Sequence, residues 1–358
     1  MRDKKISKLN FKEKNRASAF LKRILTNKLF FNKFKTTSIK RLEEPLDINS
    51  IKKKLYYQSF SIEVLDPRNG SLRSHSFNNR WCLEIQNIIL EPRQGLMYSL
   101  DKKLIIESTC WNPLEVYRSY PWLPKNPSNY PVIEMGICLT SSSYYHWLIE
   151  DLPAVIFSMK CHPSSPLIVS NGSPGYVKEF AQNSGRKVIY VTGPQFVKKL
   201  VFVEKQNDSG WPSKPDVAEV LNYPLFKKSI STEKNSKKYY ISRRYSKRSP
   251  ANEAEIEVLS VEFGFEVLYL ESISLTKQVN LISQASCLVG IHGAGHANMI
   301  WMKPGSKVVD IVNENYWTEA NHRLANLKNQ TYLPFLYKGE INNSINLKEL
   351  SKFLKLLK

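Results

Sequence analysis

Long apolar runs are missing from this sequence. No stretch reaches the roughly 18 consecutive apolar residues that a membrane-spanning helix needs. Residues 1–15 also lack the apolar centre that defines a secretory signal peptide. Because both features are absent, we expect a protein that is soluble or bound at the surface of a membrane.

Cysteine is scarce and follows no pairing pattern. The chain has five cysteines, an odd number, and no C-x-x-C spacing. This argues against a disulfide framework and against a structural zinc site. We therefore expect reduced thiols and a cytoplasmic location. The five residues are Cys82, Cys110, Cys138, Cys161 and Cys287.

Acidic residues are few compared with basic ones. Lys and Arg number 52 and Asp and Glu 32, which gives a formal net charge of +20. Residues 1–41 hold 14 basic and 2 acidic residues, so this arm alone carries +12, and phenylalanine and leucine are interleaved with its lysines. Such an arm can lie on anionic lipid, bind nucleic acid or remain a solvated helix. We expect contact with an anionic membrane surface and no nucleic-acid partner.

The length of the chain indicates two domains of ordinary size. The sequence has 358 residues, of which 42% are hydrophobic. Residues 56–106 consist of short extended pieces, a β-rich prelude, and residues 113–131 hold five prolines and suit an extended connector. We place a basic arm at 1–45, an α/β domain at 46–208, a second α/β domain at 216–340 and a C-terminal helix at 341–358.

Alternating strands and helices predict a layered α/β fold in both domains. In the first, strands at 166–170, 187–191 and 196–203 accompany a helix at 176–183, which is typical of a Rossmann-like unit. The polar segment 206–215 is rich in Gly and Pro and suits an interdomain linker. In the second, strands at 238–242, 265–270, 286–291 and 306–312 alternate with helices at 252–263 and 274–283. This order predicts parallel strands with helical crossovers, which bind ligands outside the strand C-termini.

The segment Ser141–Phe157 carries a first candidate for catalysis. Serines precede a helix-periodic apolar run, and His146 and Glu150 stand four residues apart on one helix face. Such a pair can take a proton from a substrate hydroxyl, either with His146 as the base and Glu150 orienting it or with Glu150 itself as the base. The same spacing also occurs in purely structural pairs. It resembles half of a zinc site too, but no third ligand follows at a useful spacing.

A glycine-rich turn follows the apolar run Ser286–Ile291. Gly293 and Gly295 allow a phosphate to approach the backbone, and the helix that follows offers unpaired N–H groups and the positive end of its dipole. His292 and Asn298 can add side-chain donors. The alternative is an ordinary strand-to-helix turn, because a short Gly-x-Gly motif has little specificity.

A run of basic residues follows the predicted strand 238–242. Arg243, Arg244, Lys247 and Arg248 stand at the end of the sheet where the glycine turn is also expected. Guanidinium groups at this place can close on a pyrophosphate. A solvated basic loop is the alternative.

Several separate motifs occur together in one order. They are residues 145–153, 240–244, 252–253, 290–298 and 304–311, and with them residues 60–340 resemble glycosyltransferase family 61, formerly called DUF563. The resemblance implies a GT-B-like fold, in which two Rossmann-like domains face a cleft and the C-terminal one binds a nucleotide sugar. It also implies inversion at the anomeric carbon of the sugar.

The resemblance assigns roles to the candidate residues. His146 and Glu150 correspond to the acceptor-side pair, and we include the adjoining Asp151 among the candidate catalytic residues. The phosphate clamp comprises Arg243 and Arg244, to which the basic run adds Arg248. The donor turn comprises His292, Gly293, Ala294, Gly295 and Asn298.

The same resemblance suggests partners and a setting. Without a membrane anchor, the chain looks like a bacterial-type enzyme of capsular or surface polysaccharide assembly, with a glycan or lipid-linked glycan acceptor. It would work in the cytoplasm, at the inner face of the membrane. No D-x-D motif is present, since Asp151 and Asp310 stand singly, so we expect no cofactor and no metal ion.

Two other functions are compatible with the motifs. One is a non-catalytic nucleotide- or glycan-binding relative, which the His146/Glu150 pair argues against. The other is a dinucleotide-dependent oxidoreductase. A dinucleotide-binding turn has a third glycine and, about 20 residues later, an acid that binds the ribose. This turn falls late in the chain and lacks both in their usual context.

Overall fold

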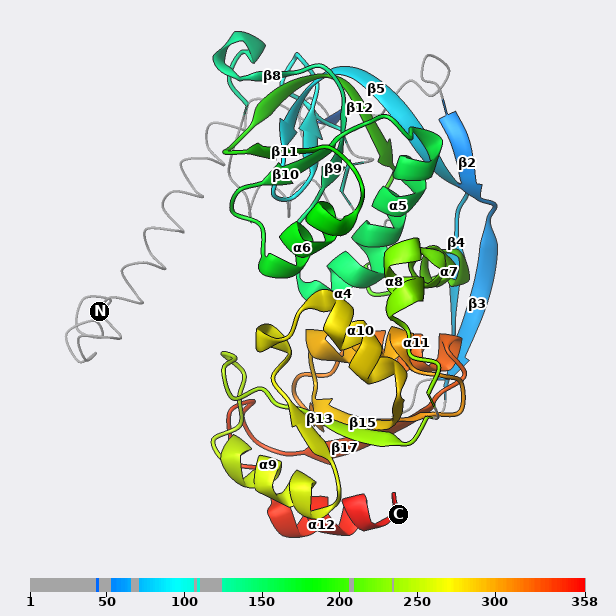
Figure 1. The fold of residues 1–358 in the computed structure, drawn as a ribbon, viewed down its shortest axis with the longest axis vertical. Helices are drawn as coiled ribbons and strands as arrows, with labels where there is room; N and C mark the ends of the chain where they lie inside the picture. The colour runs from blue at the N-terminus through cyan, green and yellow to red at the C-terminus, as the bar shows by residue number, and fades with distance from the viewer. Residues whose placement is uncertain are drawn as a thin grey trace, which may run out of the picture.

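The computed structural model describes residues 43–44, 53–65, 71–105, 108–109, 124–205, 209–233 and 235–357. The basic arm at 1–41 lies outside these residues, as do positions 113–123 of the proline-rich connector and Cys110. Within the described residues, strands and helices form two lobes stacked along the long axis of the molecule (Figure 1). This confirms the predicted α/β class.

The N-terminal lobe is built on a mixed ten-stranded sheet. Its main order is β1-β7-β6-β5-β12-β9-β10-β11, with β2 also paired to β5 and β8 to β12. The strands β12, β9, β10 and β11 run parallel, whereas β5 pairs antiparallel with β12. The prelude therefore contributes strands to the same sheet. The bounds are β1 Glu43–Glu44, β2 Lys53–Tyr57, β5 Arg80–Glu91, β6 Leu96–Tyr98, β7 Leu104–Ile105, β8 Val132–Ile133, β9 Gly136–Leu139, β10 Leu167–Ser170, β11 Val188–Val191 and β12 Gln195–Val203.

The C-terminal lobe contains a five-stranded sheet in which every pair of strands is parallel. Its order is β14-β13-β15-β16-β17. Helices α10 and α11 lie on the face toward the N-terminal lobe, and α9 and α12 cover the opposite face (Figure 1). The bounds are β13 Lys237–Ile241, α9 Glu253–Glu262, β14 Glu266–Leu268, η5 Leu270–Ser272, α10 Leu275–Ser283, β15 Ala285–Ile291, η6 Ala294–Trp301, β16 Lys307–Asn313, α11 Ala320–Leu327, β17 Thr331–Tyr337 and α12 Leu347–Lys355.

The remaining helices lie in the N-terminal lobe and between the lobes. They are η3 Pro127–Asn129, α4 Tyr144–His146, η4 Trp147–Asp151, α5 Leu152–Cys161, α6 Gly175–Asn183, α7 Lys214–Asn222 and α8 Pro224–Ser229. The predicted linker at 206–215 extends into α7, whose N-cap Ser213 accepts a hydrogen bond from the amide of Asp216. In the described part of the chain, no helix has the length and apolar character needed to cross a bilayer.

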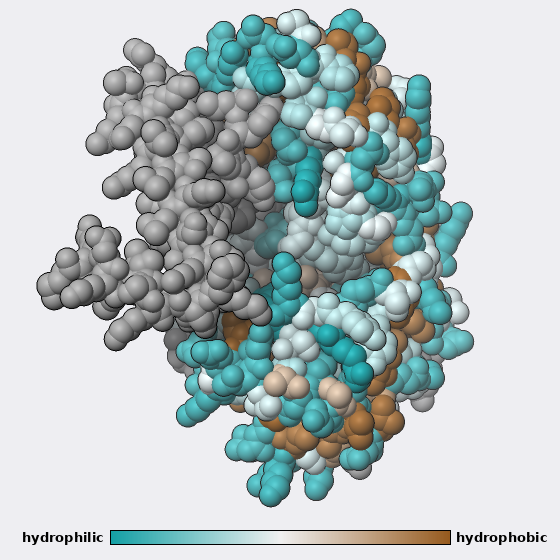
Figure 2. Space-filling model, turned by 90° about the vertical axis from the view of Figure 1, so that its left-hand side faces the viewer, coloured by the Kyte–Doolittle hydropathy of each residue, from teal (hydrophilic) through white to brown (hydrophobic). Residues whose placement is uncertain are grey.

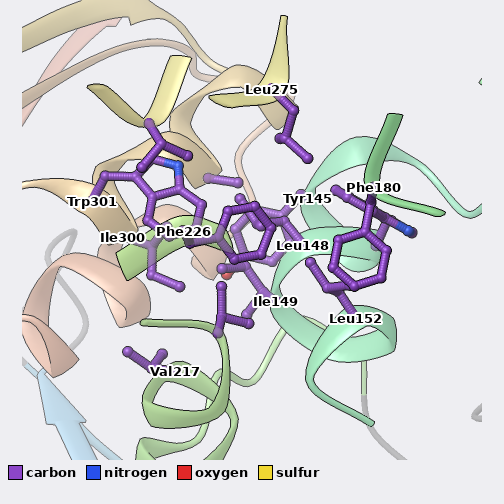
Figure 3. Close-up of a cluster of buried hydrophobic side chains, with 14 of the residues drawn as sticks. Tyr145, Leu148, Ile149, Leu152, Phe180, Val217, Phe226, Leu275, Ile300 and Trp301 are labelled. Atoms are coloured by element: carbon purple, nitrogen blue, oxygen red, sulfur yellow. The ribbon is translucent and has the colours of Figure 1, made fainter. Parts of the chain in front are cut away.

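One apolar core joins the two lobes. Leu148, Ile149 and Phe180 of the N-terminal lobe belong to the same buried cluster as Ile300 and Trp301 of the C-terminal lobe (Figure 3). A large apolar interface of this kind limits the relative motion of two domains. The lobes are therefore packed together, which leaves little room for the wide hinge closure that a polar linker suggests.

A hairpin also links the lobes along one side of the molecule. Strands β3 (Phe60–Leu65) and β4 (Leu72–Phe77) pair only with each other among the described strands, and they run from the upper lobe down beside the lower one (Figure 1). Arg73 of β4 forms an ion pair with Glu319 before α11, with 3.0 Å between nitrogen and oxygen.

Candidate active site

A pocket of about 240 Å³ lies where the carboxyl ends of β13 and β15 meet the first turn of η6. Ligands of open parallel sheets bind at this edge. Two tyrosines of the N-terminal lobe, Tyr144 and Tyr176, form part of the wall, so the pocket lies between the lobes. Its polar and turn residues include Arg243, Arg248, Glu271, Ala294, Gly295 and His296.

The guanidinium group of Arg243 lies directly against the glycine turn. Its Nη1 donates to the carbonyl oxygen of His292, and a Cβ atom at Gly293 would overlap that same nitrogen. Gly293 has extended backbone angles, with φ at 165°, so glycine is required here for space. The arginine and the turn, 50 residues apart in the sequence, therefore form one surface of the pocket.

Arg248 supplies a second cation at the pocket. Its guanidinium carbon lies 4.7 Å from the centre of the Tyr316 ring. Among the described residues, no carboxylate forms an ion pair with Arg243 or Arg248. Burial and the charge of Arg248 lower the pKa of Arg243, partly offset by the carboxylates of Glu253 and of Glu271, which also lines the pocket. Two adjacent guanidinium groups that form no ion pair favour a bound anion.

Arg244 does not line the pocket. Its guanidinium group is ion-paired with Glu257 of α9, with Nε 3.1 Å from Oε1. Glu257 also accepts from the hydroxyl of Ser242 at 2.6 Å, and Glu253, one helical turn earlier, accepts from the amide of Arg243 at 2.7 Å. The two glutamates of α9 thus hold the arginine turn in place, and Arg244 is part of that support.

The predicted side-chain donors His292 and Asn298 are both buried. The Nδ1 atom of His292 lies 2.8 Å from Asp310 Oδ2 and its Nε2 atom 3.1 Å from Thr318 Oγ1. Asn298 accepts from the hydroxyl of Tyr144 at 3.0 Å, which joins η6 to the N-terminal lobe. Neither side chain lines the pocket, whereas the backbone at Ala294 and Gly295 does.

The segment after the glycine turn is a 3-10 helix, η6, and Ala294 and Gly295 open it. The first amide N–H groups of a helix have no carbonyl partner within that helix, so those of Ala294 and Gly295 are available to a ligand. At the turn where the sequence predicts an anion site, main-chain amides and Arg243 therefore face the pocket, with the side chains of His292 and Asn298 behind them.

The acceptor-side pair stands on a helix that changes its pitch. Residues 144–161 run through α4, η4 and α5, and η4 is a π-helical turn in which the amide of Leu152 donates to the carbonyl of Trp147, five residues earlier. Pro153 accounts for the wider turn, because it has no N–H group and its ring would clash with the carbonyl of Ile149 in an α-helix. Ser143 occupies the N-cap position without a side-chain capping bond.

His146 and Glu150 form the predicted contact. The Nδ1 atom of His146 lies 3.1 Å from both carboxylate oxygens. Glu150 also accepts from the hydroxyl of Ser209 at 3.1 Å and from the amide of Gly210 at 2.6 Å. The side chain of His146 is 41% exposed and that of Glu150 20%. Burial lowers the pKa of His146, but the hydrogen bond and charge of Glu150 outweigh it and raise that pKa.

Arg323 of α11 fixes the backbone that holds Glu150. It donates to the carbonyl of Gly210 at 3.3 Å and forms an ion pair with Glu319 at 2.8 Å. Gly210 has a φ of 84°, a conformation that glycine adopts readily and other residues rarely do. Trp211 lies between Arg323 and the stacked ring of His75 on β4. The contacts of Glu150 therefore depend on both lobes.

Asp151 is placed apart from the His146/Glu150 pair. Its carboxylate is 4% exposed and accepts from the hydroxyls of Thr140 and Ser142 at 2.8 and 2.6 Å, and Lys205 is its ion-pair partner. Burial would raise the pKa of Asp151, but Lys205 lowers it. It lines a small pocket of about 40 Å³ in the N-terminal lobe together with Lys205.

Four residues at or near the site could not be selected from sequence patterns. Tyr144 and Tyr176 line the pocket from the other lobe, Tyr316 supports Arg248, and Arg323 supports Gly210. Tyr144 adjoins the motif at 145–153, but its position in the sequence does not show that it faces the C-terminal lobe.

Hydrophilic residues predominate among the coloured residues on the side of the molecule shown in Figure 2.

The residues that the structure describes include no group of three or more His, Cys, Asp or Glu side chains arranged to hold a metal ion. Described thiols at Cys82, Cys138, Cys161 and Cys287 are free.

The comparison with known proteins agrees with the chemistry of this site. No curated protein matches the chain. Residues 144–309, from Tyr144 at the pocket wall to β16, match the family described as Glycosyltransferase 61. This segment contains His146, Glu150, the arginine turn and the glycine turn. The match supports a glycosyltransferase of family 61.

Proposed function

We propose that this protein is an inverting glycosyltransferase that moves a sugar from a nucleotide-sugar donor to a hydroxyl of a glycan acceptor. One observation carries the proposal. Arg243, Arg248 and the glycine turn converge on one pocket at the carboxyl edge of a parallel sheet. This combination of cations and open amides suits the diphosphate of a nucleotide sugar.

The donor diphosphate would lie between the two guanidinium groups and the amides of Ala294 and Gly295. In a glycosyl transfer the diphosphate gains negative charge as the bond to the anomeric carbon breaks. Fixed cations and N–H dipoles stabilise that charge without reorganising. Arg243 is already held by the carbonyl of His292 and by Ser246, whose hydroxyl lies 3.0 Å from its Nε. The pocket is thus preorganised for the leaving group.

On the acceptor side, we propose His146 as the base and Glu150 as the group that orients it. Glu150 already accepts hydrogen bonds from the backbone of Gly210 and from Ser209, and these bonds fix its carboxylate against the imidazole. With its Nδ1 proton directed at Glu150, His146 presents the lone pair of Nε2 to an acceptor hydroxyl. The hydroxyl oxygen attacks the anomeric carbon from the face opposite the diphosphate, which inverts its configuration.

The pocket and the proposed base lie on different sides of one helix. Tyr144 lines the pocket, whereas His146, two residues later, does not and contacts Glu150 and Ser209 instead. We propose that the transferred sugar extends from the pocket around the start of this helix to an acceptor at His146, with the GT-B arrangement of two facing domains providing the two sides. The roles of Arg244 and Asp151 are then to support the arginine turn and the N-terminal lobe.

The acceptor that we propose is a lipid-linked glycan of surface or capsular polysaccharide assembly. The basic arm at 1–41 would bring the enzyme to anionic lipid. Co-sedimentation with vesicles of phosphatidylglycerol and phosphatidylcholine tests this, comparing the full chain with one that lacks residues 1–41. Equal pelleting of both forms would remove the membrane part of the proposal.

The donor and the reaction are tested together. A thermal-shift screen against uridine, guanosine and cytidine diphosphate or monophosphate sugars should show stabilisation by one nucleotide class. Turnover of that donor with a glycan acceptor should persist in excess EDTA, as expected for a reaction without a metal ion. Binding without turnover would favour a non-catalytic relative, and stabilisation by a nicotinamide dinucleotide alone would favour an oxidoreductase.

A further inference from the structure

Thr318, an exposed residue, places its hydroxyl against a buried histidine–carboxylate pair. Its Oγ1 lies 3.1 Å from His292 Nε2, and His292 Nδ1 lies 2.8 Å from Asp310 Oδ2. His292 is 7% exposed and Asp310 is fully buried, whereas Thr318 is exposed. A hydroxyl, an imidazole and a carboxylate in this order are the arrangement that activates alcohol nucleophiles.

The contacts determine which nitrogen carries the proton. Burial would raise the pKa of Asp310, but His296 and His292 lower it to about 2, so its carboxylate is ionised and accepts only. Its Oδ2 also accepts from Asn321 at 3.0 Å and from the hydroxyl of Tyr332 at 2.8 Å. The amide nitrogen of Asn321 lies 3.3 Å from His292 Nδ1 as well, but its shorter contact is the one to Asp310. An imidazole lone pair facing this carboxylate at 2.8 Å would be repelled, so the proton lies on Nδ1. The lone pair of Nε2 is then directed at Thr318.

This group adjoins the proposed donor pocket. His292 is the residue before Gly293, and its carbonyl accepts from Arg243. Its ring lies 6.1 Å from that of Tyr316, the residue over which Arg248 stacks. The His292 side chain lies behind the glycine turn, so Thr318 is connected to the pocket through Tyr316 and Arg248. A glycosyl group on a diphosphate held by Arg248 would have to extend past Tyr316 to reach the Thr318 hydroxyl.

We propose that Thr318 is a base-activated alcohol that accepts a glycosyl group from the donor, so that the chain glycosylates itself at this position. The Thr318 Oγ1–C1 bond forms as the bond between C1 and the diphosphate oxygen breaks. The hydroxyl proton passes to Nε2 of His292, and the nucleotide diphosphate leaves. Thr318 is the nucleophile, His292 the base, and Asp310 the positioning residue. The glycosyl part of this inference rests on the proposed function.

The activated alcohol is tested without any sugar. A fluorophosphonate probe forms a bond from phosphorus to a nucleophilic hydroxyl oxygen and releases fluoride, and peptide mass spectrometry locates the adduct. We expect labelling at Thr318 at least tenfold faster than at Thr331, an exposed threonine on β17 that serves as the internal control. Thr318→Ser should keep the labelling and Thr318→Val should abolish it. Labelling of Thr318 no faster than of Thr331 would overturn the proposal.

Asp310→Asn tests the positioning role. An asparagine at this position can donate to Nδ1, which moves the imidazole proton to Nε2 and removes the lone pair that faces Thr318. We expect at least a tenfold slower labelling, with nucleotide diphosphate binding kept as evidence that the pocket is intact. His292→Gln, which removes the base itself, should give the same loss. Unchanged labelling in the variant that still binds nucleotide would show that the carboxylate has no such role.

The glycosyl step is tested with the nucleotide sugar that the protein turns over. Incubated without another acceptor, the full chain should gain the mass of one sugar residue on the peptide containing Thr318. Thr318→Val should prevent this, and Thr331→Val should leave it unchanged. A donor that is turned over without modifying Thr318 would overturn self-glycosylation. A protein that turns over no donor but is still labelled by the probe would instead contradict the proposed function.

Discussion

Arg323 of the C-terminal lobe stacks on Trp211, with its guanidinium carbon 3.5 Å from the centre of the indole ring. The same arginine holds the carbonyl of Gly210, whose amide in turn holds Glu150. The carboxylate that orients the proposed base is therefore positioned by a residue from the other lobe.

Replacing Arg323 should affect both stability and turnover. Arg323→Gln removes a cation–π contact, a hydrogen bond and the ion pair with Glu319, so we expect the free energy of unfolding to fall by about 1–3 kcal/mol. We also expect a lower kcat with nearly unchanged KM for the donor, because Glu150 loses part of its support. Urea unfolding and steady-state kinetics measure the two effects. Lys198→Gln breaks an exposed ion pair with Glu134 and serves as the control, with a stability change of about 0–1 kcal/mol.

Turnover should depend on the ionisation of His146. A base must be neutral, so kcat should rise with pH through the pKa of His146, which Glu150 raises. Glu150→Gln removes the charge that raises this pKa, so the rising limb should move to lower pH while the plateau falls. His146→Gln should reduce kcat by about 10²–10⁴-fold with donor binding unchanged. A pH profile in Glu150→Gln that coincides with the wild type would show that Glu150 does not act through His146.

The two neighbouring arginines should behave differently. Arg243→Ala removes a cation that faces the pocket, and we expect nucleotide diphosphate to bind about 10–100-fold more weakly. Arg244→Ala breaks an ion pair with Glu257 and should change this affinity by less than about threefold. Titration calorimetry with the diphosphate compares them. Equal losses in both variants would mean that Arg244 reaches the ligand after all.

Gly293→Ala should weaken donor binding through a steric effect alone. A methyl group at this position would overlap Arg243 Nη1, so the guanidinium must move out of its place. We expect a stability loss of about 1–3 kcal/mol together with weaker diphosphate binding. Gly175→Ala is the matched control, because nothing lies within 4 Å of the added carbon at the start of α6. Thermal unfolding and calorimetry on both variants distinguish a local clash from a general effect of replacing glycine.

The Asp151–Lys205 pair should contribute to stability at neutral pH and not in acid. Because the folded pKa of Asp151 is lowered below its ordinary value of 3.8, the contribution is present above that value and is lost as the pH falls through the folded pKa. Asp151→Asn removes the carboxylate of this buried pair, and we expect the free energy of unfolding to fall by about 3–5 kcal/mol at pH 7, a loss that shrinks toward pH 3. Unfolding free energies of the variant and the wild type, measured from pH 7 to pH 3, test whether the difference between them shrinks in acid.

Much of the fold could be predicted because it depends on local patterns. Apolar alternation and Gly or Pro breaks located β13, β15 and β16 and the helices α9 and α10 within a few residues. Because the carboxyl ends of parallel strands lie at one edge of a sheet, the sequence also predicted that Arg243 and the glycine turn lie close together. The spacing of His146 and Glu150 also sufficed, since a contact four residues apart survives the change to a π-helical turn.

The type of each element and the motifs at strand ends can thus be predicted from the chain alone, because they follow from the periodicity of neighbouring residues. Three-dimensional packing was needed to show that β5 joins the sheet antiparallel to β12, that Arg248 faces the pocket while Arg244 faces α9, and that Arg323 supports Glu150. These relationships depend on which faces pack together across long stretches of chain. Residues that are adjacent in the sequence, such as Arg243 and Arg244, can therefore contact different parts of the folded protein.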